Sequence, residues 1–172
     1  MHIVLGIIGL ITAAYIFVIR ARNAAEMTHE LMDMADDVRA AARRLGFRRN
    51  KAQHPMDAVD DPNTAAATVA VAYLELDDLP TAEQRAKLMV ALQSGLEVDK
   101  SGAEELMVLG RWLMNQCNGA EPAVTRAARA LFKLTGGDVG PLMEILAAAS
   151  TEPISDKQRD ALAEVKRAFR LT

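Results

Sequence analysis

Three acidic side chains around one predicted turn are the strongest candidates for chemistry in this sequence. Asp77 and Asp78 follow an alanine-rich stretch, and Glu83 comes five residues after Asp78. A calcium-binding loop needs oxygen ligands at alternating positions and a glycine for its sharp turn. Here Pro80 interrupts the segment, and the segment contains no glycine. The pattern therefore favours helix capping and solvation over a metal site.

The other reactive residue types do not form a catalytic or zinc-binding set. His2, His29 and His54 are far apart and have no cysteine at a zinc-binding spacing. Cys117 ends an apolar stretch, which favours a buried, inert thiol over a reactive one. The sequence contains no nucleophile elbow, phosphate-binding loop or dinucleotide-binding fingerprint. We therefore expect a protein that is not an enzyme and has no catalytic residue, cofactor or metal ligand.

The composition excludes several classes of protein. Hydrophobic residues make up 51% of the 172 residues and aromatic residues only 4%, with a net charge of −3. Disordered chains are poor in apolar residues, and a disulfide scaffold needs more than one cysteine. A dedicated nucleic-acid binder needs a basic excess to neutralise phosphates. We therefore expect a helical, alanine-rich protein with neither a nucleic-acid partner nor a small-molecule substrate.

Residues 1–19 predict a single N-terminal transmembrane helix. The 17 residues from 3 to 19 carry no charge and would form about 26 Å of helix, the short end of a membrane span. A signal peptide would need a basic start and a small-residue cleavage site, and both are missing, so we favour an uncleaved anchor in the lipid bilayer. A buried soluble helix is the other alternative. Because Arg20 and Arg22 follow the span, we expect a bacterial-type inner-membrane protein with its N-terminus outside and its bulk in the cytoplasm.

Residues 20–46 predict a long amphipathic helix next to the membrane. Its apolar residues alternate at spacings of three and four, which forms a narrow stripe: Ala24, Met27, Leu31, Met34, Val38, Ala41 and Leu45. This stripe favours docking on a partner helix or on the chain's own domain over a free-standing coiled coil. Together with Gly6 and Gly9 of the predicted span, it is the expected contact with another membrane protein or complex.

A basic segment and a predicted linker follow this helix. The segment 43–51 is rich in arginine and lysine, and it is interpreted as a solvated helix end, with an acidic protein surface or anionic lipid as alternatives. Gly46 predicts a helix stop, and the pairs His54-Pro55 and Asp61-Pro62 indicate turns. The segment 47–61 is therefore predicted to be a linker.

Residues 62–172 predict a bundle of helices. The helix at 62–77 is apolar nearly all round, which is typical of a helix at the centre of a bundle. The dense apolar middle of the helix at 101–118 makes it the second central helix. Three capping boxes mark helix starts: Thr81 with Gln84, Ser101 with Glu104, and Ser155 with Gln158. Glycines and caps predict further helices at 81–94, 121–135, 138–149 and 155–170.

The stretch from Asp61 to Leu171 resembles a TerB-like (tellurite-resistance) helical domain. The matching pieces are the end of the alanine-rich helix, the turn after it and the start of the last helix: Ala72-Tyr73-Leu74-Glu75-Leu76-Asp77-Asp78, Leu79-Pro80-Thr81-Ala82-Glu83 and Ile154-Ser155-Asp156-Lys157-Gln158. Asp78 stands where the family's glycine would be expected. The resemblance implies an all-α bundle and, in some members, metal binding through acidic residues near this turn.

The expected function follows from these features together. We expect a non-catalytic, membrane-anchored interaction protein: an accessory subunit, scaffold or assembly factor that docks on an inner-membrane complex, for example a respiratory one. The alternative is a stress or metal-response module, which the TerB-like resemblance implies.

Overall fold

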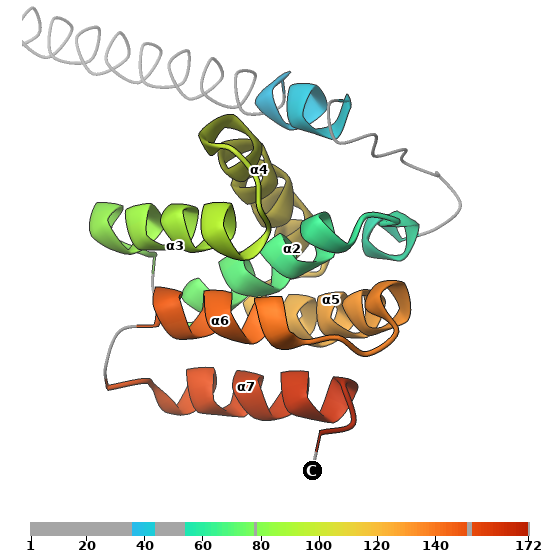
Figure 1. The fold of residues 1–172 in the computed structure, drawn as a ribbon, viewed down its shortest axis with the longest axis vertical. Coiled ribbons are helices and arrows are strands. Elements are labelled where there is room, and N and C mark those ends of the chain that lie inside the picture. Colours follow the sequence, from blue (N-terminus) through green and yellow to red (C-terminus); the bar gives the residue numbers. More distant parts are fainter. Residues whose placement is uncertain (1–35, 44–53, 78, 151–152, 172) are drawn as a thin grey trace, which may run out of the picture. The chain divides into compact units, whose positions relative to one another are not determined.

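All regular secondary structure in the described part of the chain is helical. The computed structural model describes residues 36–43, 54–77, 79–150 and 153–171, and residues 36–43 are helical. The remaining elements follow in chain order (Figure 1): η1 (Pro55–Ala58), α2 (Pro62–Leu74), α3 (Ala82–Gly95), α4 (Lys100–Gln116), α5 (Ala120–Thr135), α6 (Gly140–Ala149) and α7 (Asp156–Ala168). The predicted all-α class is confirmed.

The membrane anchor predicted for residues 1–19 lies outside the described residues, together with Gly6, Gly9, Met27, Leu31 and Met34. Within the described ranges, no helix is both long and apolar enough to cross a bilayer. The anchor and its orientation stay predictions.

Two residues of the apolar stripe predicted in the segment 20–46 are described. Val38 is half-buried, and Ala41 is 2% exposed and belongs to the hydrophobic core of the unit that begins at residue 38. The described part of the stripe therefore packs on the chain's own domain through Ala41.

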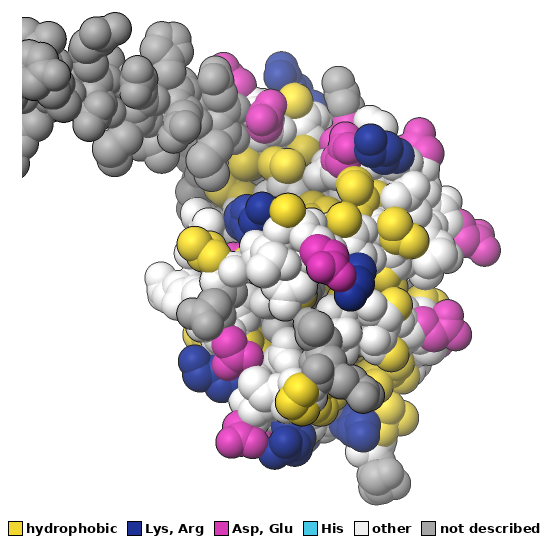
Figure 2. Space-filling view, turned by 90° about the vertical axis from the view of Figure 1, so that its left-hand side faces the viewer, with side chains coloured by type: hydrophobic (Ala, Val, Ile, Leu, Met, Phe, Trp, Pro, Cys, Tyr) yellow, Lys and Arg dark blue, Asp and Glu magenta, His cyan; other side chains and the backbone are white. Residues whose placement is uncertain are grey.

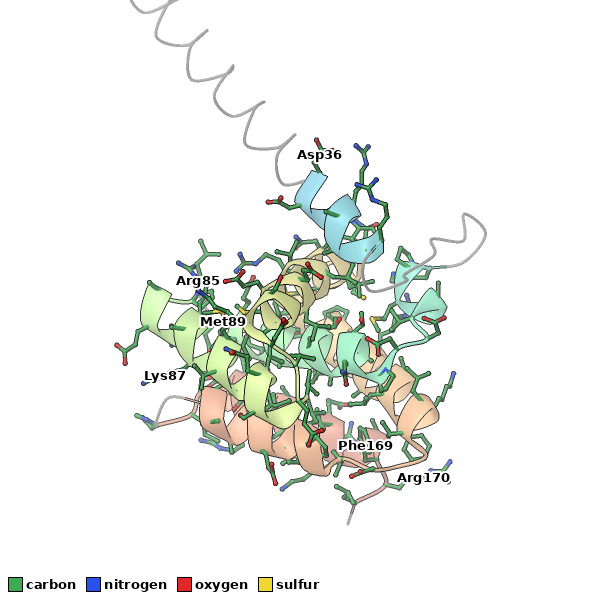
Figure 3. All side chains as sticks on the ribbon, turned by 45° about the horizontal axis from the view of Figure 1, so that its top comes forward. Asp36, Arg85, Lys87, Met89, Phe169 and Arg170 are labelled. Carbon is green, nitrogen blue, oxygen red and sulfur yellow. The ribbon has the colours of Figure 1, made fainter. Side chains whose placement is uncertain are left out.

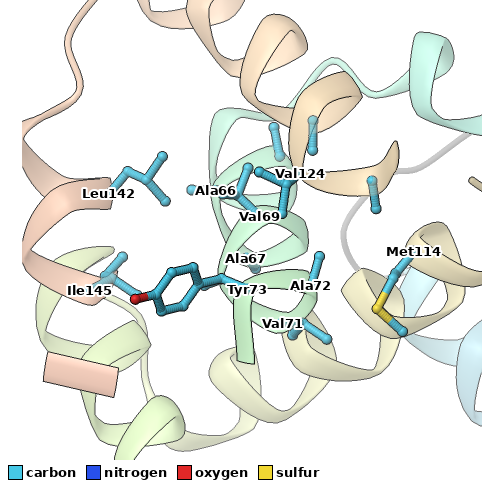
Figure 4. Close-up of a cluster of buried hydrophobic side chains, with 14 of the residues drawn as sticks. Ala66, Ala67, Val69, Val71, Ala72, Tyr73, Met114, Val124, Leu142 and Ile145 are labelled. Carbon is cyan, nitrogen blue, oxygen red and sulfur yellow. The ribbon is translucent and has the colours of Figure 1, made fainter. Parts of the chain in front are cut away.

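Helix α2 is the centre of the bundle, as its all-round apolar sequence predicts. Every residue from Thr64 to Leu74 is buried, and α4, α5 and α6 pack around it (Figure 4). The Tyr73 ring lies beside α6, and its hydroxyl group is 3.0 Å from Ser150 Oγ, so the one polar atom of this large side chain has a partner. The helix ends at Leu74, three residues earlier than predicted.

Small residues let α2 and α4 approach closely. A Cβ atom built on Gly110 of α4 would lie 3.2 Å from the carbonyl oxygen of Ala67 and 3.3 Å from Thr68 Cα. Glu75 lies just beyond the end of α2, and its Oε1 accepts a hydrogen bond from Arg111 Nε of α4 at 2.7 Å. This charge-assisted bond ties the two helices together. Glycine at position 110 therefore allows a helix–helix distance that a side chain would prevent.

Two of the three predicted capping boxes are confirmed. Thr81 Oγ1 accepts from Gln84 N at 3.2 Å and Gln84 Oε1 accepts from Thr81 N at 2.8 Å, while Ser155 and Gln158 repeat this pair at the start of α7. The predicted box at Ser101 is wrong. Asp99 caps α4 instead, with its carboxylate accepting from Gly102 N at 2.7 Å, because an ionised acceptor two residues earlier starts the helix before Ser101.

The last helix, predicted at 155–170, packs through one apolar face. Val165 and Phe169 are buried, and the Phe169 ring meets the Phe132 ring of α5 edge to face at 5.7 Å. The Arg170 guanidinium group lies 5.4 Å from the centre of the Phe132 ring, a cation–π contact at the end of the chain (Figure 3). These contacts hold α7 against α5.

Candidate ligand-binding groove

A groove of about 850 Å³ is lined by residues of η1, of the end of α4 and of one face of α5. Figure 1 shows the arrangement of the helices that contribute to it. Its charged lining consists of Asp57, Arg126, Arg129 and Lys133. Three cations therefore face one carboxylate. The rest of the lining is mixed: His54, Met56, Val59, Gln116, Cys117, Asn118, Pro122, Thr125, Ala130 and Leu134.

The sequence of α5 places these cations on one side of the helix. Arg126, Arg129 and Lys133 are spaced by three and four residues, so their side chains follow one face. The other face is buried and consists of small and aliphatic residues: Ala123, Val124, Ala127, Ala128 and Leu131. Because this apolar face packs on α2, the three cations have to point away from the core.

The opposite wall of the groove is fixed by His54. Its Nδ1 accepts from the backbone N–H of Met56 at 3.1 Å, so the ring proton is on Nε2, which lies 3.0 Å from the carbonyl oxygen of Gln116. The imidazole thus joins η1 to the last turn of α4. Met56, which is completely buried, anchors η1 in the core, so this part of the predicted linker 47–61 is structured.

The three groove cations differ in their surroundings. Arg126 Nε lies 3.8 Å from Asp57 Oδ1, and both side chains are about half exposed, so water screens this pair and it contributes little stability. Arg129 and Lys133, in contrast, have no carboxylate partner within the described ranges. Their charges are available to a ligand.

Cys117 lines the groove and is 6% exposed. Burial raises the pKa of its thiol, an effect that Arg126 opposes and Asp57 reinforces. A raised pKa leaves less thiolate at neutral pH, and the thiolate is the reactive form. The predicted inert, buried thiol agrees with this environment.

We expect iodoacetamide to alkylate Cys117 several-fold more slowly in the folded chain than in the chain unfolded in urea, both at pH 8. The rate in the folded chain should keep rising at pH values where the unfolded thiol is already largely ionised, because the folded pKa is the higher one. Mass spectrometry of timed samples measures both rates. Equal rates in the two states would contradict a buried thiol.

Two of the three acidic residues singled out in the sequence, Asp77 and Glu83, are described by the structure, and both are exposed. Glu83 Oε1 pairs with Lys87 Nζ at 3.0 Å on the outer side of α3 (Figure 3), and Asp77 is exposed. Asp78 lies outside the described residues. Among the side chains that the structure describes, no group of three or more His, Cys, Asp or Glu residues could hold a metal ion.

The groove was missed by the sequence analysis, although part of its signal is present there. The spacing of Arg126, Arg129 and Lys133 is visible in the predicted helix 121–135 and marks one charged face. On the face of the molecule that Figure 2 shows, basic and acidic side chains are interspersed. What the local sequence does not show is the opposite wall, because His54 reaches Gln116 across 62 residues.

Comparison with known proteins gives no match: no family model, curated protein or solved structure is significantly similar to this chain. The TerB-like resemblance stays a prediction.

Proposed function

We propose that this chain is a non-catalytic interaction protein, held in the membrane by residues 1–19, that serves as an accessory subunit, scaffold or assembly factor of an inner-membrane protein complex. The groove on α5 is the observation that carries this proposal. Its volume of about 850 Å³ falls in the range of ligand-binding clefts, and it presents Arg129 and Lys133 without an intramolecular carboxylate partner in the described part of the chain. The uncharged segment 3–19 supports the membrane attachment.

We expect the full chain, purified by an affinity tag in mild detergent, to elute together with at least one integral membrane protein. Removal of residues 1–19 should release the chain from the membrane fraction and greatly reduce this co-elution, because attachment places the domain beside its partner and raises its effective concentration. Circular dichroism of the shortened chain provides the control, since its helical signal should persist. A full chain that elutes by itself as a folded monomer would refute the proposal.

A further inference from the structure

We propose that the groove on α5 binds an acidic, extended peptide segment of a partner protein. The inference rests on the proposed function, because it names the surface through which an interaction protein of this kind would hold its partner. Four observations carry it: the charge of the groove, its length, its mixed lining and the rigidity of its walls.

The charge of the groove selects an anionic ligand. Arg126, Arg129 and Lys133 lie along one side, and Asp57 is the single carboxylate of the lining. Asp57 partly neutralises Arg126, which leaves the Arg129–Lys133 half of the groove as its most positive part. Carboxylates that bind there would form charge-assisted hydrogen bonds, which are stronger than neutral ones, and arginine can hold a carboxylate with two parallel N–H donors.

The dimensions of the groove suit a short extended segment. The lining residues of α5 run from Pro122 to Leu134, which corresponds to about 18 Å along a helix axis. An extended chain advances about 3.3 Å per residue, so about five or six residues fit beside this face. The three cations are about 5 Å apart along the axis, close to the 6–7 Å repeat of alternate side chains on one side of an extended peptide.

The lining can serve the remaining parts of such a peptide. Leu134, which is 37% exposed, and the half-buried Ala130 offer apolar contacts between the cations. Asn118 and Thr125 bring an amide and a hydroxyl group to the lining, and these can bond to peptide backbone groups. A peptide with alternating acidic and apolar side chains matches this arrangement.

The same lining argues against nucleic acid as the ligand. It contains no phenylalanine, tyrosine or tryptophan on which a base could stack, and Asp57 would repel a phosphate. The walls are also held in place without a ligand, because His54 links η1 to α4 and Met56 is buried in the core. A preformed groove loses little conformational entropy when a peptide binds.

The test uses the full chain in mild detergent and a fluorescently labelled seven-residue peptide of alternating glutamate and leucine, with an amidated C-terminus. Fluorescence anisotropy should show saturable binding that weakens as salt increases. The double variant R129E/K133E should bind at least about tenfold more weakly, because two attractive contacts become repulsive. A peptide with glutamine in place of glutamate should lose binding to the unaltered chain to a similar extent.

A matched control separates the groove from net charge. The double variant K100E/K166E makes the same change of charge at two exposed lysines outside the groove lining, so it should bind the peptide nearly as well as the unaltered chain. All four positions are exposed, and circular dichroism should show the same helical signal in both variants.

Three results would overturn the inference. The first is no saturable peptide binding by the unaltered chain, and the second is an equal loss of affinity in the two double variants. The third is calorimetric binding of glycerol phosphate, a lipid-headgroup probe, that depends on Arg129 and Lys133 while the peptide does not bind. If a membrane protein still co-elutes with the R129E/K133E variant in any of these cases, the proposed function stands and its contact lies elsewhere.

Discussion

Gly110→Val is expected to lower the free energy of unfolding by about 3 kcal/mol, at the upper end of the usual cost of overpacking a core. The first added atom alone would lie 3.2 Å from the carbonyl oxygen of Ala67 and 3.3 Å from Thr68 Cα. These atoms belong to the backbone of α2, which is buried on all sides and cannot shift locally. Urea unfolding of the full chain in detergent, followed by circular dichroism, measures the change.

Two further variants test whether close helix approach is the cause. Gly140→Val places the same side chain at the exposed start of α6, where a Cβ atom would meet, apart from its chain neighbours, only Asp138 Oδ1 at an ordinary 3.4 Å. Because Pro141 follows and restricts the residue before it, we expect a loss of about 1 kcal/mol, still well below the loss at position 110. Gly110→Ala should fall between the two, because the contact is tight but alanine gains about 1 kcal/mol in helix propensity over glycine. Equal losses at positions 110 and 140 would contradict the close α2–α4 contact.

The central position of α2 was predictable because a helix that is buried on all sides lacks a polar face in its sequence. A helix with one exposed side needs polar residues at regular spacings, and residues 64–74 offer almost none. Thr68 is completely buried, and its hydroxyl group donates to the carbonyl oxygen of Thr64 at 2.7 Å. The two buried threonine hydroxyl groups of this helix are thus satisfied locally and the Tyr73 hydroxyl group by Ser150, so composition and structure agree.

Helix starts were predictable only where one residue had no competitor for the capping role. Thr81 and Ser155 each precede a glutamine at the third helical position and have no acidic residue within the two positions before them. Ser101 satisfies the same pattern with Glu104, but Asp99 precedes it, and its carboxylate accepts the hydrogen bond of the Gly102 N–H group. A pattern that scores each candidate separately does not weigh this competition.

The groove could be predicted only in part, because one wall follows from local sequence and the other from tertiary contacts. The cationic side of α5 follows from helical spacing, which is local. The position of η1 depends on the buried Met56 and on the contact of His54 with the end of α4, and both are tertiary interactions. Residues 54–62 contain two prolines and three aspartates, so the local pattern indicates a linker.

Leu109→Ala is expected to lower the free energy of unfolding by about 2–5 kcal/mol, because it removes a completely buried side chain and leaves a cavity. The cost of such a cavity depends on how well its neighbours can fill it. Leu109 lies on α4, which packs against α2, and the buried side chains of α2 are mostly alanine, valine and threonine. Short side chains cannot swing into a void, so we expect a value in the upper half of this range.

Leu79→Ala is the matched control, because it deletes the same atoms from a side chain that is 84% exposed. We expect a change within about 0.5 kcal/mol. Both variants are compared with the unaltered chain by urea unfolding in the same detergent, and the slope with denaturant should stay constant if each change acts on the folded state. Since the deleted atoms are identical, the difference between the two losses measures burial at Leu109. Losses of similar size at both positions would contradict the placement of α4 in the core.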